Sequence, residues 1–249
     1  MKRKLKIVVT FLFITLSISC STENPLITSA TNPPKVNTPL SLPTLNATVN
    51  YLALGDSYTI GQSVCETCKF PEQLKESLRN LNLQNSFSLE IIARTGWTTS
   101  ELIQAIEINK PAPNFDLVSL LIGVNNQYRG LNFSIYEKEF PQLVSKAISL
   151  AKGDKNKLIV VSIPDYAYTP YGQSFGNTEY ISNEIDRYNS FAKSYCEANA
   201  ILFINITDIS RQGLNKTNLV ASDGLHPSDY AYTLFVERIL PGAVTILNK

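Results

Sequence analysis

The chain has 249 residues, of which 44% are hydrophobic and 17% are charged, and its formal net charge is +1. This is ordinary globular composition, and the length suits one α/β domain with additional N-terminal sequence. The near-zero net charge argues against a protein built to bind nucleic acid or another strongly charged partner.

The N-terminus has the pattern of an export signal. A basic segment, MKRKLK, precedes the apolar run IVVTFLFITLSIS, and Cys20 follows directly. Because the run is short for a membrane span, we expect a signal peptide over residues 1–19. The small residues before Cys20 resemble a bacterial lipoprotein processing site, although Ser17 occupies the −3 position where leucine is usual. The resemblance implies an exported protein of the bacterial cell envelope, anchored to a membrane by lipid on Cys20. The alternative is an ordinary secretory peptide.

Residues 20–47 are rich in Ser, Thr, Asn and Pro and show no apolar periodicity. Such a composition is typical of a disordered, extended tether. We therefore expect the folded domain to occupy residues 48–249. A tether would let an anchored domain reach its substrate, although any secreted protein tolerates one.

From residue 48 onward, β-rich apolar runs alternate with stretches of helical spacing. The expected strands cover residues 49–56, 88–94, 116–124, 157–165 and 200–208. The expected helices cover residues 71–82, 99–109, 134–152, 180–199 and 228–247. This alternation predicts βαβ units, and hence a parallel sheet of about five strands between two helical layers, a three-layer α/β/α sandwich.

Residues that can carry chemistry stand where the expected strands end. The first strand leads into Ser57, the second into Gly96 and the third into Asn125. The segment SDGLHPSD, which precedes the last helix, contains Asp223 and His226, the only histidine of the chain. Because reactive groups gather at the carboxyl ends of parallel strands, these residues are expected to lie close together.

Ser57, His226 and Asp223 have the side chains that nucleophilic catalysis needs. A serine hydroxyl requires a base to take its proton, and imidazole is suited to this near neutral pH. The base requires an acceptor that fixes its tautomer and stabilises the imidazolium. The alternative is that His226 is a structural histidine and Asp223 a turn or helix-capping residue.

These segments together resemble the four ordered blocks of the GDSL/SGNH hydrolase superfamily, over residues 51–230. The matching residues are Gly55-Asp56-Ser57-Tyr58, Gly96, Gly123-x-Asn125-Asn126 and Asp223-x-x-His226. The resemblance implies a flavodoxin-like α/β/α sandwich that hydrolyses carboxylic esters without a metal or other cofactor.

The resemblance also implies a role for each matching residue. Ser57 would be the nucleophile, His226 the general base and then acid, and Asp223 the partner that orients His226. The backbone N–H groups of Ser57 and Gly96, with the side-chain amide of Asn125, would form the oxyanion hole.

Two residues depart from the family pattern. Tyr58 replaces leucine and either shapes the pocket or packs, and Asn126 replaces aspartate at a position that is mostly structural. Asp56 is expected to tie the turn to neighbouring backbone rather than to act in catalysis. Residues 127–129 either line the acyl pocket or form a solvated loop, and Trp97 is expected to pack rather than to contact substrate.

The cysteines beyond Cys20 are Cys65, Cys68 and Cys196. Export makes a disulfide between Cys65 and Cys68 the favoured interpretation, with two free thiols as the alternative. Cys196 falls in a helical pattern and is expected to pack as a small hydrophobic residue.

The sequence thus favours a serine esterase that acts on short-acyl, lipid or similar small esters through an acyl-enzyme. One alternative is an esterase that removes acetyl groups from polysaccharide, and the tyrosine-rich segment 164–180 favours this slightly. An alternative of another class is a surface lipoprotein that binds a ligand on a hydrolase scaffold without cleaving it. The oligomeric state is not encoded in any recognisable pattern.

Overall fold

The computed structural model describes residues 48–81 and 86–248. The expected signal peptide (1–19), the expected tether (20–47) and the expected lipidation site at Cys20 lie outside these residues. No helix in the described part of the chain has the length and apolarity needed to cross a membrane.

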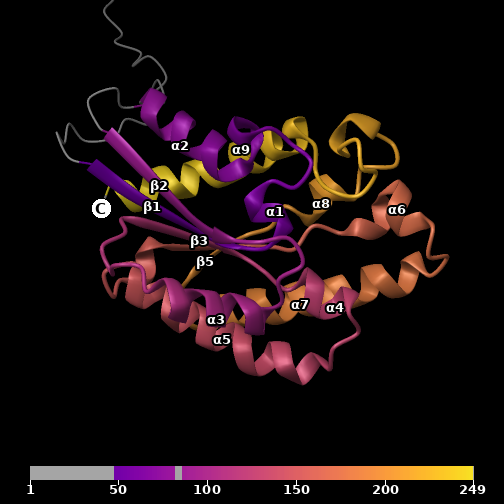
Figure 1. The fold of residues 1–249 in the computed structure, drawn as a ribbon, viewed down its shortest axis with the longest axis horizontal. Helices are drawn as coiled ribbons and strands as arrows, with labels where there is room; N and C mark the ends of the chain where they lie inside the picture. The colour runs from indigo at the N-terminus through magenta and orange to yellow at the C-terminus, as the bar shows by residue number, and fades with distance from the viewer. Residues whose placement is uncertain (1–47, 82–85, 249) are drawn as a thin grey trace, which may run out of the picture. The chain divides into compact units, whose positions relative to one another are not determined.

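The described strands form one parallel sheet in the order β2-β1-β3-β4-β5 (Figure 1). The strands are β1 (Thr48–Gly55), β2 (Ser86–Ala93), β3 (Leu117–Leu121), β4 (Leu158–Val161) and β5 (Leu202–Ile204). This is the flavodoxin-like order, whose topological switch point lies between β1 and β3. Gly55 of β1 pairs with Leu121 of β3, so the carboxyl ends of these two strands are level. Ligands of such sheets bind at this edge.

Two layers of helices enclose the sheet, which confirms the expected α/β/α sandwich. Figure 1 shows α2 and α9 over one face and α3, α5 and α7 over the other. The long helices are α2 (Phe70–Leu81), α3 (Thr99–Asn109), α5 (Phe133–Leu150), α7 (Thr178–Ala198) and α9 (Asp229–Leu247). The short helices are α1 (Ser57–Ile60), α4 (Val124–Tyr128), α6 (Pro170–Gln173) and α8 (Thr207–Ser210). Single 3₁₀ turns are η1 (Glu66–Cys68), η2 (Lys155–Lys157), η3 (Tyr166–Tyr168) and η4 (Thr217–Leu219).

The central strands are continuously apolar because helices cover both of their faces. Every residue of β3 (LVSLL) and β4 (LIVV) is buried. The one hydroxyl in these two strands, on Ser119, bonds to the hydroxyl of Tyr51 at 2.8 Å. By contrast, β2 lies at an edge of the sheet and alternates between exposed and half-buried residues along most of its length. The core therefore lies around β1, β3 and β4.

Local capping fixes where the helices near the strand ends begin. Thr98 and Glu101 form a capping box at the start of α3. Ser228 caps α9 by accepting a hydrogen bond from the N–H of Ala231 at 3.1 Å. Because Ser228 fixes the first turn of α9, the turn immediately before it, which carries Asp223 and His226, is fixed as well.

Gly55 allows β1 to turn directly into α1. A Cβ atom at this position would lie 2.1 Å from Oγ1 of Thr59 and 2.4 Å from the carbonyl oxygen of Leu121. Both contacts are far inside van der Waals distance, so only glycine lets α1 approach the end of β3 this closely. Ser57 is thereby brought to the switch point.

Candidate active site

A cavity of about 210 Å³ lies at the carboxyl ends of β1, β2 and β3. Its lining residues are Ser57, Tyr58, Thr95, Gly96, Val124, Asn125, Tyr128, Tyr166, Leu225 and His226. The structure therefore brings four of the expected site residues to one cavity. Asp223, the fifth, does not line the cavity and reaches it through a hydrogen bond to His226.

Ser57 is the first residue of α1, a helix of one turn. Asp56 caps this helix by accepting a hydrogen bond from the N–H of Tyr58 at 3.0 Å, and Gly61 ends it in a left-handed conformation. Ser57 is only 5% exposed, so its hydroxyl lies in a largely desolvated position at the cavity wall.

His226 and Asp223 form a close side-chain pair, with Nδ1 of His226 2.6 Å from Oδ2 of Asp223. An ionised carboxylate can only accept a hydrogen bond, so Nδ1 carries the proton and Nε2 of the neutral ring is the basic nitrogen. The other carboxylate oxygen, Oδ1, accepts the backbone N–H groups of Leu225 at 2.9 Å and His226 at 3.0 Å. The turn thus fixes the carboxylate, and the carboxylate fixes the imidazole tautomer.

The pKa of Asp223 lies well below its ordinary value, so this carboxyl stays ionised at neutral pH. Partial burial by itself would raise the pKa. Hydrogen bonds from Ser63, from the backbone and side chain of His226 and from the backbone of Leu225 outweigh burial and lower it. Ionised Asp223 is the form that can hold Nδ1–H of His226.

Gly96, on the loop after β2, and Asn125, in the first turn of α4, belong to segments that are tied together. The side-chain amide of Asn125 donates to the carbonyl of Trp97 at 2.9 Å, and the guanidinium of Arg129 donates to the carbonyl of Gly96. Gly96 has a φ of 86°, a left-handed conformation that favours glycine. Since the Asn125 amide has two N–H donors, one remains for a group in the cavity.

Asn126 has a structural position, as expected. It is fully buried, its oxygen accepts the backbone N–H of Thr99 at 3.0 Å, and its amide donates to Oγ1 of Thr99 at 2.6 Å. These bonds hold the start of α3 against α4. An ionised aspartate has no N–H to donate to Oγ1 of Thr99, so asparagine suits this pairing with threonine.

Asp56 is fully buried, and burial raises the pKa of its carboxyl to about 7, against the opposing hydrogen bonds from backbone N–H groups. Its bond to Tyr58 confirms the expected role of tying the turn to neighbouring backbone. Among the residues that the structure describes, Oδ2 of Asp56 has no hydrogen-bond partner.

The raised pKa of Asp56 predicts a pH-dependent stability. The folded pKa of about 7 lies above the ordinary value of 3.8, so the folded state holds the proton more tightly. This contribution is full below about pH 4 and is lost as the pH rises through 7, by roughly 4 kcal/mol at about 1.36 kcal/mol per unit. We expect Asp56→Asn to gain stability relative to the wild type between pH 5 and pH 8 in urea unfolding. A constant difference across this range, like that of the exposed Asp229→Asn control, would contradict the prediction.

For Tyr58, residues 127–129 and Trp97 the sequence raises the question of whether each side chain packs or lines the pocket, and the structure shows both roles. Tyr58 does both, because it is buried, lines the cavity and makes an edge-to-face contact with the His226 ring at 5.9 Å. Within 127–129, Tyr128 lines the cavity and Gln127 is buried, accepting the hydroxyl of Tyr166 at 2.9 Å. Trp97 packs against the core and is absent from the cavity lining, which agrees with the packing interpretation.

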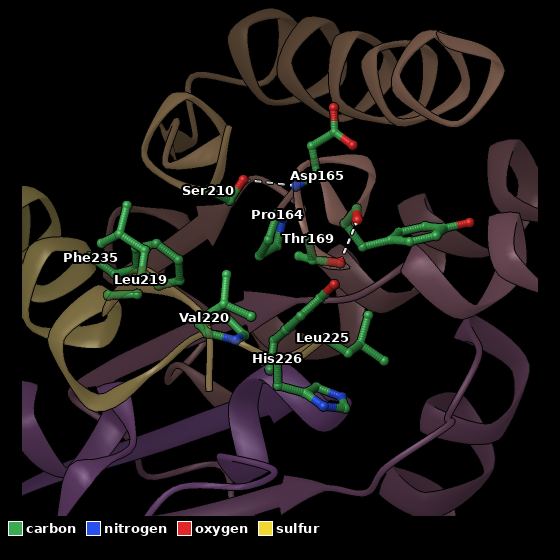
Figure 2. Close-up of a pocket in the computed structure, with 13 residues that line it drawn as sticks. Pro164, Asp165, Thr169, Ser210, Leu219, Val220, Leu225, His226 and Phe235 are labelled. Atoms are coloured by element: carbon green, nitrogen blue, oxygen red, sulfur yellow. Dashed lines mark hydrogen bonds between the residues drawn. The ribbon is translucent and has the colours of Figure 1, made fainter. Parts of the chain in front are cut away.

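A second, smaller cavity of about 20 Å³ adjoins the first (Figure 2). Figure 2 shows His226 and Leu225 on one side of it and Phe235, Leu219 and Val220 on another. Tyr58, Tyr166, Leu225 and His226 line both cavities. This volume is about that of one water-sized probe, so it adds little room to the cavity at Ser57.

The structure joins Cys65 and Cys68 in a disulfide, which confirms the favoured interpretation. Cys196 is fully buried, and burial raises the pKa of its thiol to about 12. Within residues 48–81 and 86–248, no three His, Cys, Asp or Glu side chains come close enough together to hold a metal ion.

Sequence reasoning missed Ser63, Tyr166 and Leu225. Ser63 donates its hydroxyl to Oδ2 of Asp223 at 2.5 Å, although the two residues are 160 positions apart. Tyr166 and Leu225 form apolar wall of the cavity. Leu225 stands within the Asp223-x-x-His226 block and Tyr166 within the tyrosine-rich segment 164–180, whereas no motif contains Ser63, which only the fold brings to Asp223.

The chain matches the model of the GDSL-like lipase/acylhydrolase family over residues 53–234. No curated protein matches the chain.

Solved structures with the same fold include proteins of lipolytic and esterase type. A lipolytic protein of the G-D-S-L family from Veillonella parvula is 18% identical, with a TM-score of 0.60 over 78% of this chain and 97% of that one. An esterase from Pseudoalteromonas, inhibited by monoethylphosphonate, is 19% identical, with a TM-score of 0.55 over 80% and 99%. A variant of an acetyl xylan esterase from Geobacillus stearothermophilus is 16% identical, with a TM-score of 0.54 over 80% and 97%. At these identities the likeness shows a shared fold.

Proposed function

The chain belongs to the GDSL-like lipase/acylhydrolase family, and from this premise we propose that it is a serine esterase that cleaves short-acyl esters. The observation that carries the proposal is the Asp223–His226 pair, bonded at 2.6 Å, whose imidazole lines the same cavity as Ser57. An ionised carboxylate, a fixed imidazole and a nearby hydroxyl are the parts of a nucleophilic serine mechanism.

In the proposed reaction, Oγ of Ser57 attacks the ester carbonyl carbon while Nε2 of His226 takes the hydroxyl proton. The N–H groups of Ser57 and Gly96 and the amide of Asn125 stabilise the oxyanion of the tetrahedral intermediate. His226 then gives the proton to the oxygen of the leaving alcohol, and the acyl group remains on Ser57. Water attacks this acyl-enzyme by the same steps and releases the carboxylic acid.

The size of the cavity favours a short acyl group. Its volume of about 210 Å³ lies below the range of roughly 300 to 1,000 Å³ that is usual for pockets that bury drug-sized ligands. The adjoining cavity of about 20 Å³ does not extend it by more than a water-sized space. Val124, Tyr128, Tyr166 and Leu225 supply an apolar wall. An acetyl to butyryl group suits such a space, whereas a long fatty chain would have to lie outside it.

A covalent probe tests the serine mechanism directly. Treatment of the wild type with an ethyl phosphonate ester should add one phosphonyl group to Ser57, detected by peptide mass spectrometry, and should abolish hydrolysis of p-nitrophenyl acetate. Across p-nitrophenyl esters from C2 to C12, kcat/KM should be highest at the short end. Labelling elsewhere in the chain with retained activity would overturn the proposal.

Asn125→Ala is expected to lower kcat by about 10² to 10³-fold with little change in KM, because the lost donor acts on the oxyanion and not on the ground-state ester. Steady-state kinetics on p-nitrophenyl acetate measure this split. The surface variant Asn156→Ala is the matched control and should keep wild-type kinetics. A rise in KM alone for Asn125→Ala would assign this amide to ground-state binding instead.

A second candidate function, removal of acetyl groups from a glycan, is favoured by an aromatic cluster at the cavity rim. The cluster consists of Tyr128, Tyr171 and Phe175, which are 47%, 37% and 47% exposed. The Phe175 ring contacts those of Tyr128 and Tyr171 at 6.2 and 5.2 Å, and the two hydroxyls bond at 2.8 Å. Because Tyr128 also lines the cavity, the cluster offers apolar and hydroxyl contacts to the alcohol half of a bulky ester.

The two candidates differ in what the aromatic cluster does. If the substrate is an acetylated glycan, Phe175→Ala should lower kcat/KM on acetylated xylo-oligosaccharides by up to roughly tenfold and leave ethyl acetate hydrolysis unchanged. Tyr180→Ala removes a 60% exposed tyrosine outside the cluster and serves as the control. An equal effect of Phe175→Ala on both substrates would leave the small-ester function as the better description.

A further inference from the structure

The loop that follows α1 reaches from the nucleophile helix to Asp223. Ser63, three residues after the last residue of α1, donates its hydroxyl to Oδ2 of Asp223 at 2.5 Å. The same oxygen accepts Nδ1–H of His226 at 2.6 Å. One carboxylate oxygen therefore joins the loop after Ser57 to the candidate base.

Ser63 makes this contact from an unusual backbone conformation. Its φ is 68°, in the left-handed region that residues other than glycine rarely adopt. Such a conformation costs free energy and persists only where the surrounding structure imposes it. Ser63 is exposed, so burial of its side chain does not explain its position. A backbone hydrogen bond from Val64 to the carbonyl of Gly61 at 3.3 Å closes the turn that contains Ser63, and from this turn its hydroxyl reaches Asp223.

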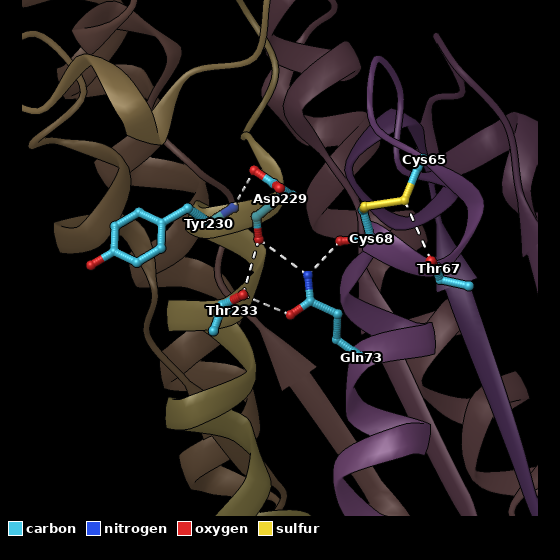
Figure 3. The surroundings of a disulfide bond; sticks show 7 residues. All are labelled: Cys65, Thr67, Cys68, Gln73, Asp229, Tyr230 and Thr233. Atoms are coloured by element: carbon cyan, nitrogen blue, oxygen red, sulfur yellow. Dashed lines mark hydrogen bonds between the residues drawn. A yellow bond between two sulfur atoms is a disulfide. The ribbon is translucent and has the colours of Figure 1, made fainter.

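The disulfide closes the far side of this loop, and Gln73 connects it to the start of α9, the helix that follows His226. Cys65 and Cys68 are joined directly after Val64, and the amide of Gln73 donates both to the carbonyl of Cys68 at 2.5 Å and to the carbonyl of Asp229 at 3.1 Å. Figure 3 shows Gln73 between the disulfide and the first turn of α9, with Thr233 donating to its oxygen at 2.8 Å. The loop is thus attached to the same turn of α9 that follows Asp223 and His226.

We propose that Ser63, held by the Cys65–Cys68 loop, is a positioning residue for the Asp223–His226 pair. This inference rests on the proposed function, in which that pair moves the proton of Ser57. Oδ2 accepts the Ser63 hydroxyl together with Nδ1–H of His226, so the Ser63 bond adds to the two backbone bonds on Oδ1 that hold the carboxylate toward the imidazole. The hydrogen bond also helps to keep Asp223 ionised, because it is one of those that lower the pKa of this carboxyl against the effect of burial.

The chain has a single histidine, so the downfield proton resonance of an Nδ1–H bonded to carboxylate can only belong to His226. Ser63→Gly removes the hydroxyl and keeps a residue suited to left-handed backbone. We expect this resonance to move in Ser63→Gly, because Oδ2 then accepts from His226 alone. Ala200→Gly, which changes an exposed left-handed residue with φ 53° in another turn, should leave it in place. An unmoved resonance in Ser63→Gly would overturn the proposal.

Kinetics supply a second readout. Ser63→Gly should lower kcat on p-nitrophenyl acetate by about 5- to 20-fold with KM unchanged. The effect is small for a lost hydrogen bond to a charged group because water can partly replace the Ser63 hydroxyl. Its thermal midpoint should stay close to that of the wild type, since relief of the left-handed strain offsets part of the lost hydrogen bond. Unchanged kcat would overturn the proposal. Failure of the wild type to hydrolyse esters would instead refute the proposed function, and the resonance measurement would still decide whether Ser63 orients the pair.

Reduction tests the part assigned to the disulfide. Treatment with a phosphine reductant should lower kcat of the wild type and should have little further effect on Ser63→Gly, because both changes act through one hydrogen bond. Cys65→Ser/Cys68→Ser should behave like the reduced wild type. If reduction lowers kcat of both proteins by the same factor, the disulfide acts independently of Ser63, and its assigned role is wrong.

Discussion

Ser57→Ala is expected to lower kcat on p-nitrophenyl acetate by about 10⁴- to 10⁶-fold, because no other group in the cavity would form the acyl-enzyme. Alanine is a good helix former, and the capping bond from Tyr58 N–H to Asp56 does not involve the Ser57 side chain. The fold should therefore be retained, with an unchanged thermal midpoint. Loss of activity in this variant then reports chemistry and not unfolding.

Two controls make the Ser57→Ala result decisive. Ser222→Ala changes an exposed serine next to Asp223 in the chain and should keep wild-type rates. Equal rates of the wild type and Ser57→Ala would refute the serine mechanism. Equal inactivity of both across the ester panel would favour a protein that binds a ligand on a hydrolase scaffold.

Most of the fold follows from the alternation of apolar runs and helical spacing. The five long helices lie where their periodicity places them, to within about two residues, because each buries one apolar face against the sheet. The ends of the strands agree less well with the ranges expected from the sequence. The run expected over 200–208 yields only Leu202–Ile204, because its one partner, β4, is itself short and offers Ile159–Val161 for pairing. Strand length depends on its neighbours, which local sequence does not specify.

The segment after β5 shows why such ends are hard to place. Thr207 donates to the carbonyl of Ile163, and Ser162 bonds to both Thr207 and Asn205. Ser and Asn are poor strand formers, and here the polar side chains bond to one another and to nearby backbone where the chain leaves β5, instead of continuing the strand ladder. In this segment Ile206 and Thr207 are buried, whereas Asn205 and Asp208 are exposed, so the expected strand does not continue here.

The candidate site was predictable to the extent that its residues stand at strand ends. Ser57, Gly96 and Asn125 meet because β1 lies between β2 and β3 in the sheet, and strand order 2-1-3-4-5 brings the segments that follow these strands to one edge. Asp223 and His226 are close in sequence, so their pairing was expected as well. Ser63 and Tyr166 reach the site through single contacts from other loops, and no periodicity or spacing marks such contacts in a sequence.

A second large loss of activity is expected from a change at Asp223, because its two carboxylate oxygens accept hydrogen bonds from different groups. Oδ1 accepts two backbone N–H groups, from Leu225 and His226, at 2.9 and 3.0 Å. Oδ2 accepts the hydroxyl of Ser63 and Nδ1–H of His226. An asparagine at 223 has one acceptor oxygen and one donor NH₂. Since backbone N–H groups cannot accept, the oxygen must face them, and the NH₂ must face His226.

Asp223→Asn should therefore force His226 into the tautomer that is protonated on Nε2, the nitrogen that accepts the Ser57 proton in the proposed reaction. A roughly 10⁴-fold loss of kcat is expected on p-nitrophenyl acetate, with the turn intact because its two backbone bonds are kept. Asp229→Asn, on the first turn of α9, is the matched control and should retain wild-type kcat. Nitrogen-15 labelling of the single histidine distinguishes the tautomers, and Nδ1 should change from protonated to unprotonated in Asp223→Asn. Retained kcat together with the changed tautomer would show that Nε2 of His226 is not the base, and the mechanism through Ser57 would have to be abandoned.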